Sequence, residues 1–295
     1  MSTLRELKGR IGSVASTQKT TSAMKMISSA KMVKAVAQVQ RLLPYRNMVH
    51  GLLAHLLGTD VEFSSPLLEE REVARLAIVV MGSDDGLCGA FNMNIFKQLT
   101  TIVDEACAAH GKQLRIDIYP VGKKMRKAVA KLASKTVTVQ ETPIDTRSNG
   151  DQLHDFTELL RQRFVDHEVD AVKVVYMHYV SSSRQRLSVE QLLPISPQAL
   201  SEAAATVKNP CEPCLFEPDA NTIFNSVLPL HLRATMQDIF TESTASEQAS
   251  RVMAMQTASD NAAELLDELN LEYNKLRQQS ITTELLDILG GQVER

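Results

Sequence analysis

A glycine-rich loop is the first place where residue types and spacing in this chain could do chemistry. Residues 82–89 read GSDDGLCG and follow an apolar run, and a loop between a strand and a helix often cradles a phosphate. The loop lacks the Lys-Ser/Thr pair and the glycine spacing of the known nucleotide motifs, and Asp84 and Asp85 would repel a phosphate. We therefore interpret it as a tight turn, in which Ser83 or Asn92 caps the next helix. Nucleotide binding by a Rossmann-like enzyme is the alternative.

The other candidate sites are weaker. Cys211 and Cys214 form a single C-x-x-C among three prolines, which lacks the four ligands of a zinc site. An extended segment with incidental thiols is the first interpretation, and a redox switch is the alternative. The seven histidines are scattered and form no catalytic or metal-binding motif. We therefore expect no catalytic residue, no metal and no cofactor.

Composition points to long helices in a reducing compartment. Apolar residues make up 44% of the 295 residues, aromatic residues make up 4%, and methionine occurs 12 times. Four cysteines do not form a disulfide framework. There is no apolar signal segment at the start and no run of 18 apolar residues. These features predict a cytosolic chain that reaches a membrane only through partners.

The two ends of the chain favour a pair of long helices. The first 43 and the last 66 residues contain no proline, a residue that disrupts helix interiors. Residues 1–46 carry nine bases and one acid, whereas residues 236–295 carry eleven acids and four bases. The ends should therefore attract each other. This acidic partner, and the lack of interleaved aromatic residues, argue against nucleic-acid binding.

Apolar spacing supports the same pairing. The N-terminal seam runs through Leu4, Leu7, Ile11 and Val14, and we expect it to resume at Met24, Ile27, Ala30 and Val33 or Ala37. The C-terminal seam is expected at Ala262, Leu265, Leu269, Tyr273 and Leu276. Such spacing is typical of coiled coils. We favour one C-terminal helix that begins near Asn221 over a new start at the capping box Thr244–Glu247, and we expect both helices to be free of proline.

The middle of the chain alternates between strand and helix patterns. We predict strands at 75–81, 115–121, 136–140, 170–180 and 186–195, and helices at 91–110, 122–133 and 151–167. Such alternation implies a mostly parallel sheet covered on both faces, with the last strand at its edge. The predicted fold class is α/β: a long antiparallel coiled coil of the N- and C-terminal helices plus a Rossmann-like, mostly parallel α/β domain. The expected boundaries are 1–60 and 219–295 for the coiled coil, 70–205 for the α/β domain and 206–218 for a connector.

Several stretches together resemble the γ subunit of F-type ATP synthase. They are STQKTTSAMKMISSAKMVKA near the start, SDDGLCGAFNMNIF after the first strand, VEQLLPI, and the tail from ASEQASRVMAMQ to LLDILGG. The tail is the most specific of these. The loop departs from the family pattern DRGLCGG, because Asp85 replaces the arginine and Ala90 replaces the second glycine.

The resemblance implies a central rotor shaft that performs no bond chemistry. The implied partners are the α and β subunits (α3β3), the ε subunit and the membrane c ring, with no nucleic acid. The implied location is the cytoplasmic face of the bacterial plasma membrane, where the chain would be peripheral. At the implied rotor-stator interface, Met24 with its neighbour Lys25 lies near the acidic lever region of β. Arg277 and Gln278 hydrogen-bond a loop of β, and Thr282 and Glu284 take part in the same coupling. A coiled-coil scaffold unrelated to rotation is a further hypothesis.

Overall fold

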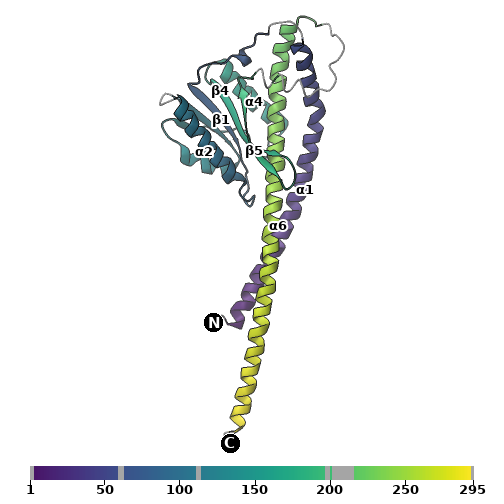
Figure 1. The fold of residues 1–295 in the computed structure, drawn as a ribbon, viewed down its shortest axis with the longest axis vertical. Coiled ribbons are helices and arrows are strands. Elements are labelled where there is room, and N and C mark those ends of the chain that lie inside the picture. The colour runs from purple at the N-terminus through teal and green to yellow at the C-terminus, as the bar shows by residue number, and fades with distance from the viewer. Residues whose placement is uncertain (1–2, 59–62, 111–113, 197–199, 201–215, 294–295) are drawn as a thin grey trace. The chain divides into compact units, whose positions relative to one another are not determined.

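The computed structural model describes residues 3–58, 63–110, 114–196, 200 and 216–293 (Figure 1). Its contacts divide the chain into two units. Residues 30–250 form the sheet unit, and residues 1–29 together with 251–295 form the two-helix unit. The two longest helices, α1 (Leu4–Leu57) and α6 (Ala220–Val293), contribute residues to both.

A five-stranded sheet organises the sheet unit. Its strands are β1 (Arg75–Met81), β2 (Arg115–Val121), β3 (Val137–Val139), β4 (Ala171–Tyr179) and β5 (Gln185–Leu193). They lie in the order β3-β2-β1-β4-β5, with neighbouring strands parallel except for β5, which pairs antiparallel with β4 at the edge. The prediction of a mostly parallel sheet with the last strand at its edge is confirmed, and the structure adds that this edge strand is antiparallel.

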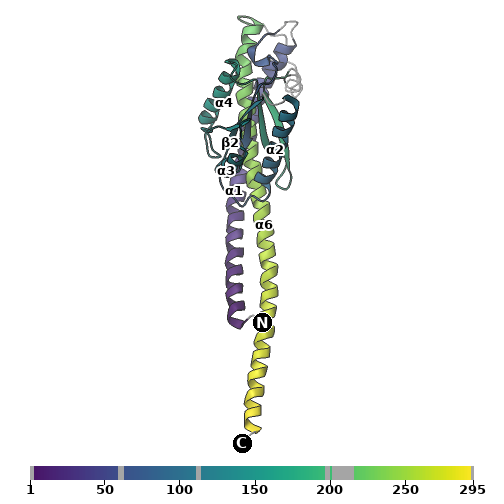
Figure 2. The same cartoon turned by 90° about the vertical axis from the view of Figure 1, so that its left-hand side faces the viewer.

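Helices cover both faces of this sheet (Figure 2). They are α2 (Phe91–His110), α3 (Lys123–Val129) and α4 (Gly150–Val165), with short 3₁₀ turns η1 (Pro66–Leu68) and η3 (Ala130–Leu132). Side chains alternate along β1: Leu76 and Ile78 pack with α2 and α3, whereas Ala77 and Val79 pack with α4, α1 and α6. A strand that is buried on both faces is expected in a parallel sheet.

Both long helices contain a proline, contrary to the expectation of proline-free helices. Pro44 lies within α1 and Pro229 lies within α6. An interior proline costs about 3 kcal/mol. Near these prolines, Val49, Leu53, Leu56, Phe224 and Leu228 are buried in the core beneath the sheet. Each such side chain contributes about 1.5–3 kcal/mol on burial, so packing offsets the local cost and the helices continue.

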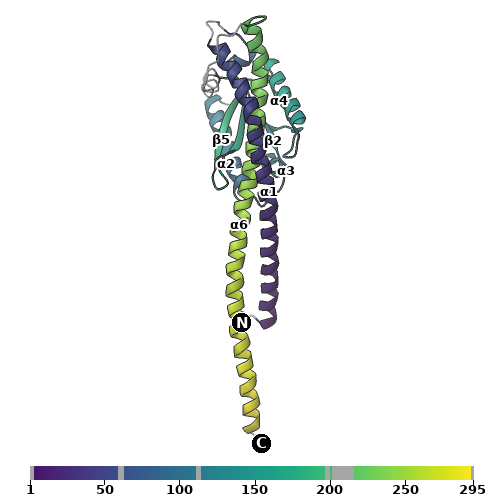
Figure 3. The same ribbon diagram turned by 90° about the vertical axis from the view of Figure 1, so that its right-hand side faces the viewer.

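In the two-helix unit, α1 and α6 lie side by side and run in opposite directions, as Figure 3 shows. The contact seam on α1 keeps one heptad register through positions 4, 7, 11, 14, 18, 21, 25 and 28, all of which are buried or half-buried. The expected resumption at Met24, Ile27 and Ala30 is therefore wrong, because Ile27 and Ala30 are exposed. The helix keeps its 3-4 spacing whether the seam residue is apolar or polar.

The contact seam on α6 differs from the expected one at a single position. Positions 255, 259, 262, 266, 269, 273, 276 and 280 are buried or half-buried, whereas Leu265 is 39% exposed. Leu266 therefore takes the place that the sequence analysis gave to Leu265. Both leucines fit an apolar stripe, and only the fixed alternation of four and three separates them.

The end of α6 continues beyond the N-terminal end of α1 (Figures 2 and 3). Within the two-helix unit, α1 supplies residues from Leu4 to Ser29, whereas α6 supplies residues from Arg251 to Val293. The shorter segment cannot cover the longer one. From Leu285 to the last described side chains, α6 therefore presents residues to solvent on every face that the structure describes.

Candidate functional site

Four of the six predicted interface residues lie together near the end of α6. Arg277, Gln278, Thr282 and Glu284 are all exposed. Gln278 and Thr282 are four residues apart and share one face, and the Thr282 hydroxyl donates to the Gln278 carbonyl at 2.9 Å. Arg277 is fully part of this exposed surface of α6.

Met24 and Lys25 lie in a different part of the two-helix unit. Both side chains are half-buried, and Lys25 occupies a seam position. Met24 is 20 residues from Leu4, which corresponds to about 30 Å along a helix that rises 1.5 Å per residue. The four residues on α6 lie where its seam ends, near Ser280, at the N-terminal end of α1. The structure therefore does not bring Met24 and Lys25 next to them, and the predicted site consists of two separate patches.

Exposed apolar side chains lie on the same two helices as the two patches. On α1 they are Met26 and Ile27, and on α6 they are Leu271, Ile281, Leu285, Leu286 and Ile288. Leu271 is 73% exposed. Continuing the heptad of Leu4 and Leu7 without a break would have found the residues on α1, because that register leaves Ile27 off the seam. Exposed apolar groups in such number indicate surfaces that partners cover.

The glycine-rich loop uses its polar groups internally. Asp84 is buried, and its carboxylate accepts hydrogen bonds from the Lys123 backbone at 2.9 Å and from the Thr146 hydroxyl at 2.6 Å. Burial alone would raise the pKa of Asp84, but these hydrogen bonds and nearby cations outweigh it and lower that pKa. These contacts support the interpretation of the loop as a tight turn.

Asn92 does not cap α2 as expected. Its side-chain oxygen accepts from the Ser83 backbone at 3.1 Å, and its amide donates to the Ser83 hydroxyl at 2.6 Å. The two residues thus tie the start of α2 back to the end of β1. An asparagine in the first helical turn can satisfy loop groups just as readily as helix groups, and sequence alone does not distinguish the two.

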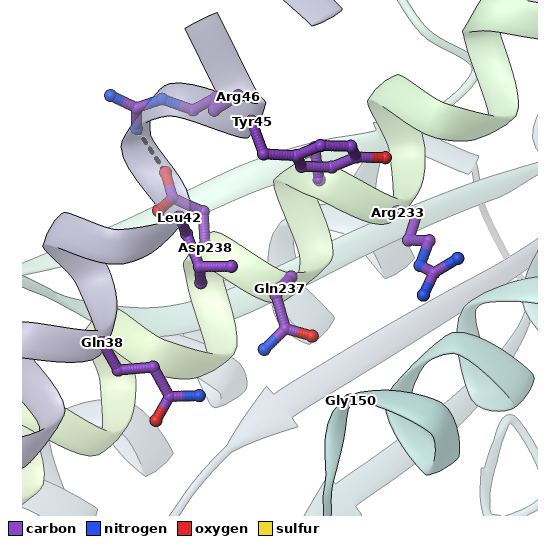
Figure 4. A pocket seen from close by; sticks show the side chains of 9 residues that line it. Gln38, Leu42, Tyr45, Arg46, Gly150, Arg233, Gln237 and Asp238 are labelled. Carbon is purple, nitrogen blue, oxygen red and sulfur yellow. Dashed lines mark hydrogen bonds and ion pairs between the residues drawn. The ribbon is translucent and has the colours of Figure 1, made fainter. Parts of the chain in front are cut away.

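A recess of about 450 Å³ lies between α1, α6 and the start of α4 within the sheet unit (Figure 4). An ion pair between Arg46 and Asp238 joins the two long helices there. Tyr45 lies across the recess, and Gln237 points toward Gly150. A β-carbon on Gly150 would stand 3.6 Å from the Gln237 side-chain oxygen, so the start of α4 approaches α6 closely.

Partly buried polar groups connect α6 to the sheet beside this ion pair. His178 of β4 is hydrogen-bonded to Glu242 of α6. Next to this contact, within the sheet, the Tyr176 hydroxyl of β4 donates to Glu190 of β5 at 3.1 Å. Burial raises the pKa of Glu242 even though His178 opposes the shift. Burial also raises the pKa of Glu190. The α6–sheet contact is therefore polar as well as apolar.

Two negative findings concern the described residues alone. In that part of the chain, no three His, Cys, Asp or Glu side chains gather in a way that could hold a metal ion. Over the same residues, no helix combines the length and apolarity needed to cross a membrane. Cys211 and Cys214 lie outside the described residues, so incidental thiols and a redox switch both remain as the sequence analysis gave them.

The fold defines a class of protein: a chain with an antiparallel pair of long terminal helices and an α/β unit built on a five-stranded, mostly parallel sheet. The family model described as ATP synthase matches residues 3–293. The ATP synthase gamma chain of Phocaeicola vulgatus is 42% identical over 294 residues and 99% of each chain. That of Bacteroides fragilis is 41% identical over 296 residues, again 99% of each. The chain belongs to the family of ATP synthase gamma chains.

A solved structure shares the fold. A chain in a Euglena gracilis mitochondrial ATP synthase, in rotational state 3, matches with a TM-score of 0.64. The two sequences are 18% identical, and the match covers 98% of this chain and 93% of that one. The fold class that the sequence predicted is therefore confirmed over nearly the whole chain.

Proposed function

We propose that this chain is the central rotor shaft of an F-type ATP synthase. It transmits torque between the membrane c ring and the catalytic α3β3 head, and so couples ion translocation to ATP synthesis or hydrolysis. Membership of the gamma-chain family supports this function, and so does the fold shared with a chain of a solved ATP synthase.

The observation that carries the proposal is the surface of the two-helix unit. The seam residues of the two helices pack against each other, and other apolar side chains, such as Ile27, Leu271 and Leu286, remain exposed. One helix extends past the other, so the unit has no threefold symmetry (Figure 3). An asymmetric axle can favour a different state in each of three identical subunits, because it makes different contacts with each one.

The proposed rotor-stator interface has two levels. Exposed apolar residues near the end of α6 allow turning, because apolar contact is non-directional. The charged and polar residues give contacts that depend on the rotary angle. The charged and polar residues of the proposed interface are Lys25 on α1, and Arg277, Gln278, Thr282 and Glu284 on α6; the apolar Met24 lies beside Lys25.

The chain itself is proposed to be non-catalytic, with bond chemistry left to the head. The shaft comprises residues 1–60 and 219–295, the α/β domain residues 70–205, and the connector residues 206–218. The α/β domain binds the ε subunit and the c ring. The complex lies at the cytoplasmic face of a bacterial plasma membrane, where this chain is peripheral, and the bacterial relatives support that location.

Reconstitution of the α and β subunits with and without this chain tests the function. We expect ATP hydrolysis to rise when one copy joins three copies of each larger subunit, and a bead attached to the sheet unit to rotate. A chain that changes neither turnover nor assembly is not a rotor and would leave the unrelated scaffold as the better hypothesis.

A further inference from the structure

A second recess lies at the end of the sheet where strands β1, β2 and β3 begin. Its volume is about 360 Å³. The residues that line it are Arg75, Leu76, Arg115, Asp117, Thr138, Arg163, Glu168 and Val169. All of them belong to the sheet unit, and none belongs to the proposed rotor-stator interface.

Two arginines stand side by side in this recess. Arg75 of β1 and Arg115 of β2 are register partners on neighbouring parallel strands, so their side chains leave the same face of the sheet about 4.8 Å apart at the backbone. Like charges placed in this way repel each other. Neither guanidinium forms an ion pair or a side-chain hydrogen bond with another described residue, and both side chains are exposed.

The two acidic side chains in the recess form ion pairs with a third arginine, Arg163. Arg163 lies 3.8 Å from the Asp117 carboxylate and 2.9 Å from that of Glu168, and it also bonds the Tyr119 hydroxyl. Nearby Asp170 accepts from the backbone N–H groups of Ala74 and Arg75. With three arginines and two acids in the lining, the recess keeps an excess of positive charge on the Arg75–Arg115 side.

We propose that Arg75 and Arg115 bind a phosphate group, carried either by a soluble phosphate ester or by a lipid headgroup. Guanidinium groups form paired hydrogen bonds with phosphate oxygens. A carboxylate has two oxygens, and one guanidinium can bind both of them. A phosphate monoester has three free oxygens, which can accept hydrogen bonds from two guanidinium groups and from the Thr138 hydroxyl. The recess falls within the size range of small-molecule sites, so it has room for the group esterified to the phosphate as well.

A titration of the full-length chain tests this site. The probes are inorganic phosphate, glycerol 3-phosphate, and phosphatidylcholine vesicles with and without phosphatidic acid, with binding followed by calorimetry and vesicle sedimentation at fixed ionic strength. We expect Arg75→Gln/Arg115→Gln to weaken binding at least tenfold. The double variant Arg184→Gln/Arg186→Gln removes the same charge from exposed positions outside the recess and should change binding less than twofold.

The outcomes separate the two sources of phosphate. Binding of glycerol 3-phosphate without vesicle binding assigns a soluble ester, and binding only to vesicles with phosphatidic acid assigns a lipid headgroup. The proposal fails if the wild-type chain binds no probe, or if both double variants weaken binding equally. Thr138→Val supplies a second check that leaves every charge in place, and unchanged phosphate binding in this variant would remove the hydroxyl from the site.

Discussion

Among single residues, Gly122 occupies a position where both the backbone conformation and the nearby backbone favour glycine. Its φ is +93°, and an added β-carbon would lie 2.7 Å from the carbonyl carbon and oxygen of Ser83. A rigid backbone group cannot move aside as a flexible side chain can. This close approach lets the Ser83 carbonyl accept the Lys124 N–H at 3.0 Å, so the glycine-rich loop and the start of α3 depend on each other.

We therefore expect Gly122→Ala to destabilise the sheet unit by about 3 kcal/mol, from positive φ and backbone overlap together. Gly51→Ala is the matched control: Gly51 is in the interior of α1, and nothing lies within 4 Å of an added β-carbon. There alanine should stabilise by about 0.5–1 kcal/mol. Urea unfolding of the two variants measures the difference, and equal midpoints would contradict it.

His231 should make stability depend on pH. Burial, followed by the neighbouring His50, lowers the pKa of His231 from 6.5 to about 4. Between pH 6.5 and about 4, His231 is therefore protonated in the unfolded chain but not in the folded chain. Stability from this residue is complete above pH 6.5 and falls as pH drops toward 4, by about 3 kcal/mol at most.

The measurement is the difference between wild-type and His231→Gln unfolding free energies from pH 7.5 to 4. We expect the unfolding free energy of the variant to rise relative to that of the wild-type chain as pH falls. The raised pKa values of Glu190 and Glu242 act with the opposite sign, so the difference, rather than either curve alone, isolates His231. Parallel curves would contradict the assignment.

At the scale of elements, the strands and helices of the sheet unit could be predicted from sequence, and the helix pairing only in part. The strand at 75–81 is buried on both faces, and its run of apolar residues was enough to predict it. The seam beyond Val14 could not be followed from apolar residues, because polar Gln18, Thr21 and Lys25 occupy it. The prolines within α1 and α6 were missed because the packing that offsets their cost is a tertiary effect.

Two nearby leucines test the revised seam. Leu269 is 3% exposed, whereas Leu265, one turn earlier, is 39% exposed. We expect Leu269→Ala to weaken the helix pair by about 2 kcal/mol, through lost burial and the space left behind, and Leu265→Ala to cost less than about 0.5 kcal/mol. Hydrogen exchange of the α1 amides from Leu7 to Val14 reports the pairing locally. A larger loss of stability from Leu265→Ala than from Leu269→Ala would contradict the revised seam and favour the one predicted from sequence.

At the scale of the whole molecule, the sequence pattern and the structure bear on different parts of the proposed function. Family membership rests on matches along nearly the full chain, and the resemblance in the terminal segments was sufficient to predict it. The geometry adds that the residues of the proposed interface form two patches, with Met24 and Lys25 about 30 Å along α1 from its N-terminal end. The two patches should therefore fail in different ways when they are changed.

Met24→Lys should separate coupling from assembly in the complete ATP synthase. Met24 is half-buried beside an already basic stretch of α1. In the proposed interface, an added cation at this position would attract acidic groups of the β subunit and stabilise one rotary angle over the others. A preference of 1.4 kcal/mol changes an equilibrium tenfold, so we expect proton pumping per ATP to fall several-fold while the purified complex keeps its subunit ratio. Met24→Gln, which is polar but uncharged, and Met93→Lys, which adds the same charge on α2, should both pump nearly normally. Equal pumping by Met24→Lys and wild-type enzyme would show that charge at this position does not act on the rotary states, and loss of the complex would show that Met24 serves assembly instead.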